Sequence, residues 1–152
     1  MGRRAVIAFF QGQYRWLSNF WPAEVKLDGV IYPTVEHAYQ AAKTINQAAR
    51  LAIAAQPTPG MAKRAGKLLP IREDWDDIKL DLMEDLVQQK FQHEDLRAKL
   101  LATGDEELQE GNIWGDRFWG VCRGHGANHL GKLLMKIRTA LKNELDESSS
   151  AV

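Results

Sequence analysis

One predicted helix carries several side chains that could do chemistry on a single face. The segment TVEHAYQAAK places Glu36, Tyr39, Gln40 and Lys43 three or four residues apart, which brings them to one side of a helix. Glu36 lies in the first turn, where the helix dipole stabilises a carboxylate and favours a base, a nucleophile or a stabiliser of cations. Lys43 could pair with a carboxylate, bind phosphate or attack a sugar carbon as an amine. A purely structural role for Glu36 at the helix start stays open.

A second group of candidate residues lies in EGNIWGDRFWGV. Trp114, Phe118 and Trp119 surround Asp116 and Arg117 within six residues. Aromatic faces beside a carboxylate suit a flat base stacked next to its sugar. The same tryptophans could instead be core residues of a folded loop, so both interpretations stay open.

The stretch from Gly126 to Lys132 has the glycine and lysine spacing of a P-loop, but Leu133 follows the lysine. A P-loop needs Ser or Thr there to hold magnesium, so triphosphate hydrolysis is excluded. The pattern predicts a glycine loop, Asn128 as helix N-cap and an amphipathic helix. The start of such a helix could still bind a phosphate group.

Charge is distributed unevenly along the chain. No acidic residue lies between Glu36 and Glu73, a stretch that carries six basic residues: Lys43, Arg50, Lys63, Arg64, Lys67 and Arg72. This could be a solvated helix face or a patch for phosphates. The formal net charge is zero, so the chain lacks the basic excess of a general nucleic-acid binder.

Composition predicts a globular protein of a reducing, cytoplasmic compartment. The 152 residues are 45% hydrophobic and include a single cysteine, Cys122. Cys122, His125 and His129 have zinc-like spacing but fall short of the four ligands of a structural site, so no metal is expected. No membrane segment is expected either, because no apolar run approaches about 20 residues.

Periodicity predicts an α+β fold, a single mostly helical domain around a small antiparallel sheet. Asp28-Gly29 marks a hairpin, and helices are expected at about 34–43, 47–55, 59–66, 74–91, 94–102 and after Asn128. Thr34, Thr58 and Asp74 are expected to cap three of these helices. The expected domain spans residues 1–145, and residues 146–152 (DESSSAV) are expected to form a disordered C-terminal tail.

Several stretches together resemble the NADAR domain family, of which the YbiA-like N-glycosidases are one branch. The resemblance covers about residues 7–141 and rests on these segments: FFQGQYRWLSNFWPAEV, YPTVEHAYQAAK, REDWDDIKLDLMEDLVQQKF, LLATGDEELQEGN, DRFWGVC and GANHLGKLLMKIR.

The resemblance implies a hydrolase that cleaves the bond between ribose C1 and a nitrogen, with no cofactor. One branch acts on early ribosylaminopyrimidine phosphates of riboflavin biosynthesis and releases ribose 5-phosphate. Another removes ADP-ribose from guanine in nucleic acid, and a non-catalytic ADP-ribose or NAD-binding module is a third alternative. The sequence leaves the choice of substrate and the oligomeric state open.

The implied catalytic residues are Glu36, Lys43 and Asp116. Glu36 would activate water or stabilise the sugar cation, whereas Lys43 would attack C1 and form a Schiff base. Asp116 would hold ribose hydroxyls or assist the leaving base. The implied substrate-binding residues are Ser18, Asn19, Phe20, Lys67, Trp75, Trp119, Asn128 and Gly131. We expect the helix that begins near Thr34 and the Asp116 loop to converge on one cleft.

Overall fold

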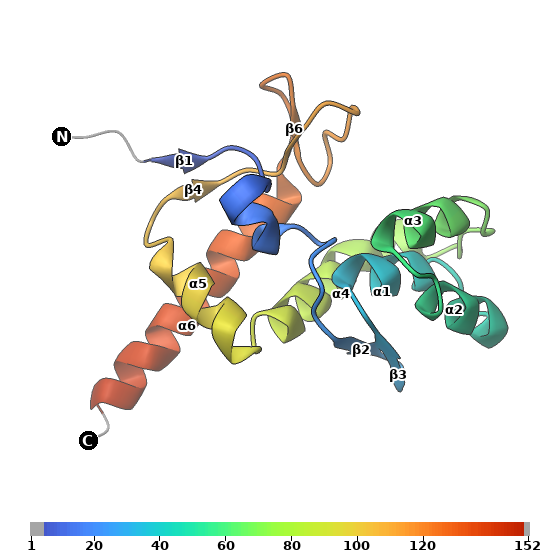
Figure 1. Cartoon of the computed structure of the whole chain (residues 1–152), viewed down its shortest axis with the longest axis horizontal. Coiled ribbons are helices and arrows are strands. Elements are labelled where there is room, and N and C mark those ends of the chain that lie inside the picture. Colours follow the sequence, from blue (N-terminus) through green and yellow to red (C-terminus); the bar gives the residue numbers. More distant parts are fainter. Residues whose placement is uncertain (1–4, 151–152) are drawn as a thin grey trace. The chain divides into compact units, whose positions relative to one another are not determined.

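The computed structural model of the chain describes residues 5–150 (Figure 1). These residues form short strands and several helices, which confirms the mixed α and β class and its mostly helical content. Within the described range, no helix is long and apolar enough to cross a membrane. The predicted domain range 1–145 and tail 146–152 include residues 1–4, 151 and 152, which lie outside the described residues.

The chain folds into two compact units. The central unit is Asn19–His93, and the terminal unit consists of the described residues of Met1–Ser18 and Glu94–Val152. Sequence patterns predicted one domain without this subdivision.

The central unit consists of a hairpin and four helices. Its elements are β2 (Val25–Leu27), β3 (Val30–Tyr32), α1 (Val35–Ala41), α2 (Gln47–Ala54), α3 (Pro59–Lys67) and α4 (Trp75–Lys90). The predicted hairpin is confirmed: β2 and β3 pair in antiparallel register, and both turn residues have positive φ, 48° at Asp28 and 84° at Gly29. Positive φ at both central positions is what a tight two-residue hairpin requires.

Side-chain caps begin three of these helices where the sequence provides Thr or Asn. Thr34, Asn46 and Thr58 accept the backbone N–H of His37, Ala49 and Met61, respectively. Asp74 was predicted to cap α4, but its side chain makes no capping bond and instead binds Arg72. The guanidinium two residues away offers two charge-assisted hydrogen bonds, which are stronger than the single bond to a backbone N–H.

Helix α1 lies at the centre of this unit and packs against α2, α3, α4 and the hairpin. Ala38 and Ala41 are fully buried on it, and Met83, Leu86 and Val87 of α4 are buried as well. The small side chains of α1 allow close packing on several sides. A helix enclosed in this way presents its polar residues in fixed positions.

Among the described residues, the terminal unit contains four short strands and three helices. Its elements are β1 (Val6–Ile7), the 3-10 helix η1 (Gly12–Leu17), α5 (Glu94–Ala102), β4 (Glu107–Leu108), β5 (Gly111–Asn112), β6 (Val121–Cys122) and α6 (His129–Ser150). β1 pairs with β4 and β5 pairs with β6, both in parallel. The predicted antiparallel sheet is confirmed only in part: among the strand pairs of the described residues, β2–β3 is antiparallel, whereas β1–β4 and β5–β6 are parallel and form separate sheets.

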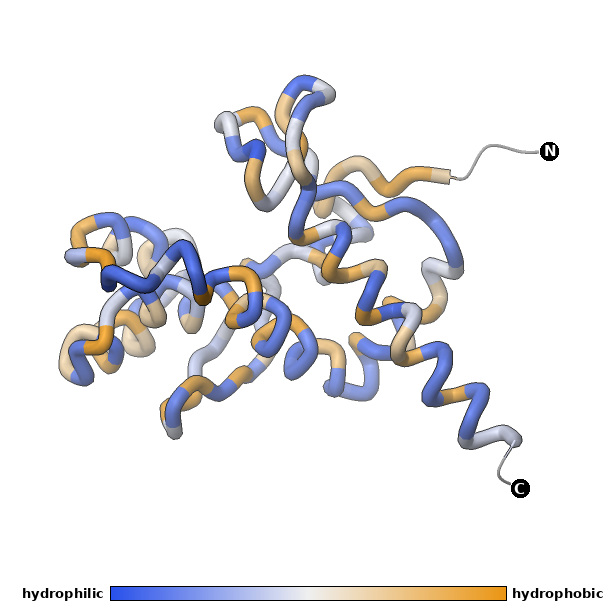
Figure 2. Tube along the Cα trace, turned by 180° about the vertical axis from the view of Figure 1, so that it is seen from behind, coloured by the Kyte–Doolittle hydropathy of each residue, from blue (hydrophilic) through white to orange (hydrophobic). Residues whose placement is uncertain are grey.

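Helix α6 continues through the segment predicted to be a disordered tail. It extends to Ser150, so residues 146–150 are helical and exposed rather than irregular. The segment contains no Gly or Pro to end the helix. Figure 2 shows hydrophobic and hydrophilic residues alternating along this helix, and its buried side includes Leu130, Leu134, Ile137 and Leu141.

Candidate functional site

The beginning of α1 is fixed by neighbouring backbone and by its own cap. The carbonyl of Asn19 accepts the N–H of Glu36 at 3.1 Å, while Thr34 caps the helix. The His37 Nε2 donates to the carbonyl of Gln56 at 2.9 Å, which leaves Nδ1 to accept from the Thr34 hydroxyl at 2.7 Å. These bonds set the position of the turn that carries Glu36.

The Glu36 carboxylate is buried, with 7% of the residue exposed. Its Oε1 accepts a hydrogen bond of 2.8 Å from Nε2 of Gln40, one turn further along α1. A buried carboxylate with a fixed donor has a defined direction and is poorly screened by water. This is the environment in which a carboxylate interacts strongly with a developing positive charge.

Lys43 lies in the turn that follows α1, because the helix ends at Ala41 and not at Lys43 as predicted, and its side chain lies against an aromatic ring. Its Nζ is 5.6 Å from the centre of the Tyr39 ring, which in turn lies 5.1 Å from the ring of Trp75. Trp75 is buried at the start of α4. The backbone of Lys43 is also held, because its carbonyl accepts the N–H of Arg72 at 2.8 Å.

The environment of Lys43 lowers the pKa of its amine. Burial is the main cause, and the positive charges of Lys63 and Lys67 act in the same direction, while the negative charge of Glu36 opposes them. The amine is therefore neutral more readily than an ordinary lysine. A neutral amine is the nucleophilic form.

Lys63 was not among the predicted site residues. It lies four residues before Lys67 on α3, so the two side chains share one face of that helix. The spacing of four residues could have paired Lys63 with Lys67 from the sequence alone. It did not stand out, because the acid-free stretch contains six basic residues with no sign of which ones lie near Lys43.

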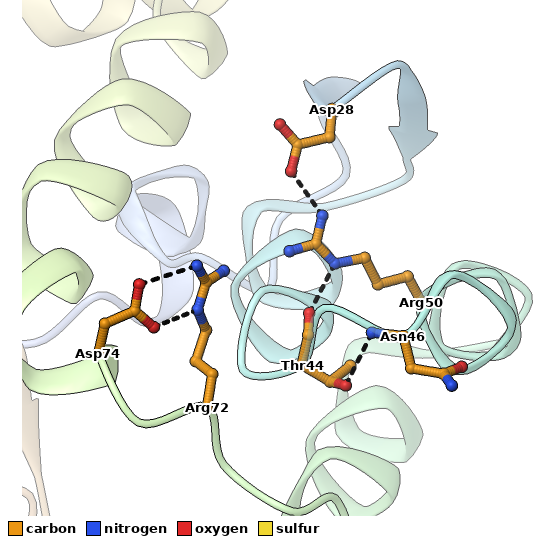
Figure 3. A network of polar contacts seen from close by, with 6 residues as sticks. All are labelled: Asp28, Thr44, Asn46, Arg50, Arg72 and Asp74. Atoms are coloured by element: carbon orange, nitrogen blue, oxygen red, sulfur yellow. Dashed lines mark hydrogen bonds and ion pairs between the residues drawn. The ribbon is translucent and has the colours of Figure 1, made fainter.

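Two of the six cations are engaged in ion pairs (Figure 3). Arg50 is buried, donates from Nε to the carbonyl of Thr44, and pairs through Nη1 with Asp28 at 2.6 Å. Arg72 forms two hydrogen bonds with Asp74, of 2.6 and 3.0 Å. These ion pairs make Arg50 and Arg72 less available to a phosphate than the sequence pattern suggests.

The remaining predicted residues near the unit boundary differ in their surroundings. Asn19 donates from Nδ2 to the sulfur of Met83 at 3.5 Å, and its backbone holds Glu36. Phe20 is 42% exposed. Ser18 belongs to the terminal unit and caps the end of η1 through its backbone N–H.

In the terminal unit, Asp116 organises the loop between β5 and β6. Its Oδ1 accepts the N–H groups of Phe118 and Trp119 at 3.1 and 3.0 Å. Among the described residues, no donor binds Oδ2, and Asp116 is half-buried. One oxygen of this carboxylate shapes the turn, and the other can accept a hydrogen bond from a ligand.

Asn112 holds this loop and was missed by the sequence analysis. Its Oδ1 accepts the N–H of Asp116 at 2.9 Å, and its Nδ2 donates to the carbonyl of Asp116 at 2.8 Å. The same Nδ2 lies 3.3 Å from the carbonyl of Val121 and 3.4 Å from that of Glu110. Asn and Asp commonly replace backbone partners in such turns, but no local pattern identifies the long-range partner of Asn112.

An aromatic cluster adjoins the Asp116 loop. The Phe118 ring lies 4.8 Å from that of Trp119 and 4.5 Å from the imidazole of His129. Phe118 and Trp119 are both half-buried. They combine the two interpretations that the sequence left open, because they pack on one side and reach solvent on the other.

Asn128 and Gly131 pack within the unit, and the Asn128 side chain does not cap α6 as predicted. The Asn128 Oδ1 accepts the N–H of Glu110, and its Nδ2 donates to the carbonyl of Leu108, so the side chain binds the β4–β5 connection instead of capping α6. The N–H groups of His129 and Leu130 donate to loop carbonyls of Phe118 and Trp119.

Gly131 lies so close to the Leu108 carbonyl and the Asn128 side chain that a Cβ there would overlap them. These contacts explain why Asn and Gly stand at these positions, and phosphate binding by them stays a prediction. Among the described residues, no group of three His, Cys, Asp or Glu side chains could hold a metal ion.

The NADAR domain family model matches residues 8–142, which is most of the chain and includes parts of both units. This chain belongs to the NADAR domain family. The resemblance inferred from the sequence motifs is thereby confirmed.

Named relatives are similar over nearly their full length. The chain is 41% identical to N-glycosidase Npun_R5314 of Nostoc punctiforme, over 87% of this chain and 88% of the relative. It is 39% identical to N-glycosidase YbiA of Escherichia coli, over 86% and 84%. The names of these relatives bear out the predicted enzyme class, a hydrolase acting on N-glycosyl bonds.

The fold agrees as well. The NMR structure of E. coli YbiA matches with a TM-score of 0.85 at 36% identity, covering 97% of this chain and 90% of that one. A longer relative, the riboflavin biosynthesis protein VVA0006 of Vibrio vulnificus, is 37% identical over 84% of this chain and 35% of its own length.

The predicted site residues thus fall into two groups. Glu36, Lys43, Lys67 and Trp75 come together around α1 in the central unit, with Asn19 supporting the helix start. Asp116 and Trp119 share the β5–β6 loop of the terminal unit. A common cleft for Glu36 and Asp116 stays a prediction.

Proposed function

We propose that this chain hydrolyses the bond between C1 of a phosphorylated ribose and the nitrogen of a base. The preferred substrate class is the early ribosylaminopyrimidine phosphates of riboflavin biosynthesis, and the sugar product is ribose 5-phosphate. The N-glycosidase names of two relatives and the riboflavin biosynthesis name of a third support this choice.

The observation that carries the proposal is the proximity of Glu36 on α1 and Lys43 in the turn that follows it. The buried carboxylate acts electrostatically on an amine whose pKa is lowered, and that amine lies over the Tyr39 ring, which in turn contacts Trp75. Breaking C1–N leaves positive charge on the sugar, which a fixed carboxylate stabilises.

The lowered pKa favours Lys43 as the nucleophile. Its lone pair forms a new C1–N bond while the bond from C1 to the base breaks, and the departing nitrogen takes up a proton. Loss of a proton from the attached amine and opening of the sugar ring give a Schiff base. Water then adds to C1 and releases ribose 5-phosphate and the free amine. Glu36 stabilises the cation in the first step and accepts a proton from water in the second.

Positive charge near this site suits the phosphate of the substrate. Lys63 and Lys67 lie on one face of α3 and act on Lys43 electrostatically. We assign the phosphate to these two lysines, with Asn19 and Phe20 as further substrate-binding candidates and Trp75 supporting the base through its ring. Ser18 keeps its predicted substrate-binding role as a proposal.

Asp116 and Trp119 keep their predicted roles as proposals about the terminal unit. The Asp116 Oδ2 would accept a hydrogen bond from a ribose hydroxyl, and Trp119 would stack on a base. We also propose a cytoplasmic location, because the one cysteine, Cys122, is a buried thiol that suits a reducing compartment.

The direct test is incubation with three substrates followed by chromatography of released base and sugar. The panel is a ribosylaminopyrimidine phosphate, ADP-ribosylated guanine in single-stranded DNA, and NAD. We expect the pyrimidine phosphate to be cleaved fastest. Faster release of ADP-ribose from guanine would move the chain to the alternative substrate class, and binding without cleavage of any substrate would make it an ADP-ribose or NAD-binding module.

Borohydride trapping separates the two mechanisms. Reduction during turnover should attach the sugar phosphate to Lys43 and inactivate the enzyme, and mass spectrometry of peptides locates the adduct. The Lys43→Arg variant keeps the charge but should give neither adduct nor product. Full activity without an adduct would assign the attack to water activated by Glu36.

A further inference from the structure

Gln40 lies between the candidate catalytic carboxylate and helix α3. The residue is 3% exposed, and its Nε2 donates to Oε1 of Glu36 at 2.8 Å. With 3% of the residue exposed, Gln40 offers almost no surface to a substrate directly. Any effect on the reaction would therefore act through Glu36.

Gly66 makes room for this amide. A Cβ at position 66 would overlap Oε1 of Gln40 and lie 2.8 Å from its Cδ and 2.9 Å from its Cβ, all closer than real Cβ atoms approach. Gly66 has no positive φ, so its backbone would accept any residue. The requirement for glycine comes from the side chain of Gln40 alone.

The amide is oriented toward Glu36 at the expense of its own hydrogen bonding. Within the described residues, Oε1 of Gln40 is buried and has no hydrogen-bond partner. Buried polar groups are rarely left in this state, and each exception calls for an explanation. Here the N–H side of the same amide is directed at a carboxylate oxygen.

We propose that Gln40, held in place by the close approach of Gly66, is a positioning residue that fixes the direction of the Glu36 carboxylate and favours its ionised form. A donor to the charged form of a carboxyl group stabilises that form. The inference rests on the proposed role of Glu36 in the N-glycosidase reaction, and deepens it by assigning the element that prepares the group.

Other charges around α1 do not replace this contact. Glu36 and Lys43 act on each other electrostatically, and Lys63 and Lys67 of α3 act on Lys43. From α2, Arg50 pairs with Asp28, while the ring of His37 is bound to Thr34 and Gln56. A change confined to Gln40 leaves all of these in place.

The test compares three variants of the full chain: Gln40→Met, Gly66→Ala and Gly60→Ala. Methionine keeps the length of glutamine without a donor. Gly60 and Gly66 lie on the same helix, but a Cβ at Gly60 would meet only the Thr58 hydroxyl, at 3.9 Å. Gly60→Ala is therefore a matched control for the change in helix propensity.

The primary measurement is titration of the Glu36 side-chain carboxyl carbon by NMR, which needs no substrate. We expect the titration to move to higher pH in Gln40→Met and in Gly66→Ala, and to stay unchanged in Gly60→Ala. Unchanged titration in both Gln40→Met and Gly66→Ala, with folded spectra, would overturn the inference. If Gly66→Ala does not fold, Gln40→Met alone decides.

Kinetics distinguish this inference from the proposed function. We expect kcat to fall about tenfold in Gln40→Met with KM unchanged, the size of one charge-assisted hydrogen bond. The acid limb of the pH profile should move to higher pH in parallel with the titration. An active Glu36→Gln variant would contradict the proposed function, whereas an inactive Glu36→Gln beside a Gln40→Met with wild-type kcat and titration would contradict the positioning role alone.

Discussion

The amine of Lys43 is held between opposing influences. Burial and the charges of Lys63 and Lys67 lower its pKa, while the carboxylate of Glu36 raises it. If the neutral amine attacks the sugar, activity rises with pH as the amine loses its proton. A lowered pKa moves that rise toward neutral pH, where an ordinary lysine would be almost wholly protonated. Lys63 and Lys67 would thus have two roles, binding the phosphate and lowering the pKa of the nucleophilic amine.

The Lys67→Gln variant tests this electrostatic effect. Removing a positive neighbour raises the pKa of Lys43, so the rising limb of kcat against pH should shift to higher pH. We expect activity below the limb to fall about two- to fivefold, the range for one exposed charge. Arg64→Gln removes a charge from the same helix that is not among those acting on Lys43, and should not move the limb. Equal shifts in both variants would show that only net charge matters.

Asp116 combines a structural oxygen with one that is free to bind. Because Oδ1 accepts two backbone N–H groups, Asp116→Asn can keep the turn while losing the negative charge. We expect kcat/KM to fall about 100-fold with little change in melting temperature. Asp116→Ala should lose activity and also about 1–2 kcal/mol of stability. Wild-type kcat/KM in Asp116→Asn would reduce the residue to its role in the turn.

At the scale of elements, the β5–β6 loop depends on one amide. Asn112 is buried and bridges Asp116 to the strands on either side. Asn112→Ala should lower the free energy of unfolding by about 2–3 kcal/mol, because several backbone groups lose their partner. Urea denaturation measures the change, and Asn143→Ala, on the exposed side of α6, should stay within about 0.5 kcal/mol of wild type. A similar loss in both variants would contradict the bridging role.

Local patterns predicted the elements that local interactions form. The Asp28-Gly29 hairpin and the caps at Thr34 and Thr58 were predicted from neighbouring residues, and the structure confirms them. The strand pairs of the terminal unit escaped prediction because they are two residues long and join distant segments, as Val6 joins Glu107. Such pairs have no signal in local periodicity.

Capping failed where a long-range or stronger partner competes. Asn128 directly precedes α6 as predicted, but its φ is 54° and its side chain binds the backbone at Leu108 and Glu110. Asp74 does not cap α4, because its carboxylate binds the guanidinium of Arg72 instead. The face that joins Glu36 and Lys43 was predictable from helical spacing, whereas Lys63 and Gln40 gained their significance only from the approach of α3 to α1.

Across the whole molecule, net charge is zero and only part of the basic stretch is available to a polyanion. Arg50 and Arg72 are paired with Asp28 and Asp74, which leaves α3 with Lys63, Arg64 and Lys67 beside Lys43. A few cations on one short helix suit a phosphorylated small molecule better than a long nucleic-acid backbone. The number of phosphates neutralised is measurable, because each one releases counterions on binding.

Binding of ADP-ribosylated single-stranded DNA should therefore depend weakly on salt. Three contacts from α3 predict a slope of log K against log salt concentration of about −2, since each phosphate contributes about 0.7 on single strands. Lys67→Gln and Arg64→Gln should each reduce the slope by about 0.7, whereas exchanging the paired Arg72 for Gln should leave it unchanged. A slope steeper than about −5 would require more phosphate contacts than α3 supplies, and would favour nucleic acid over a small sugar phosphate as the natural substrate.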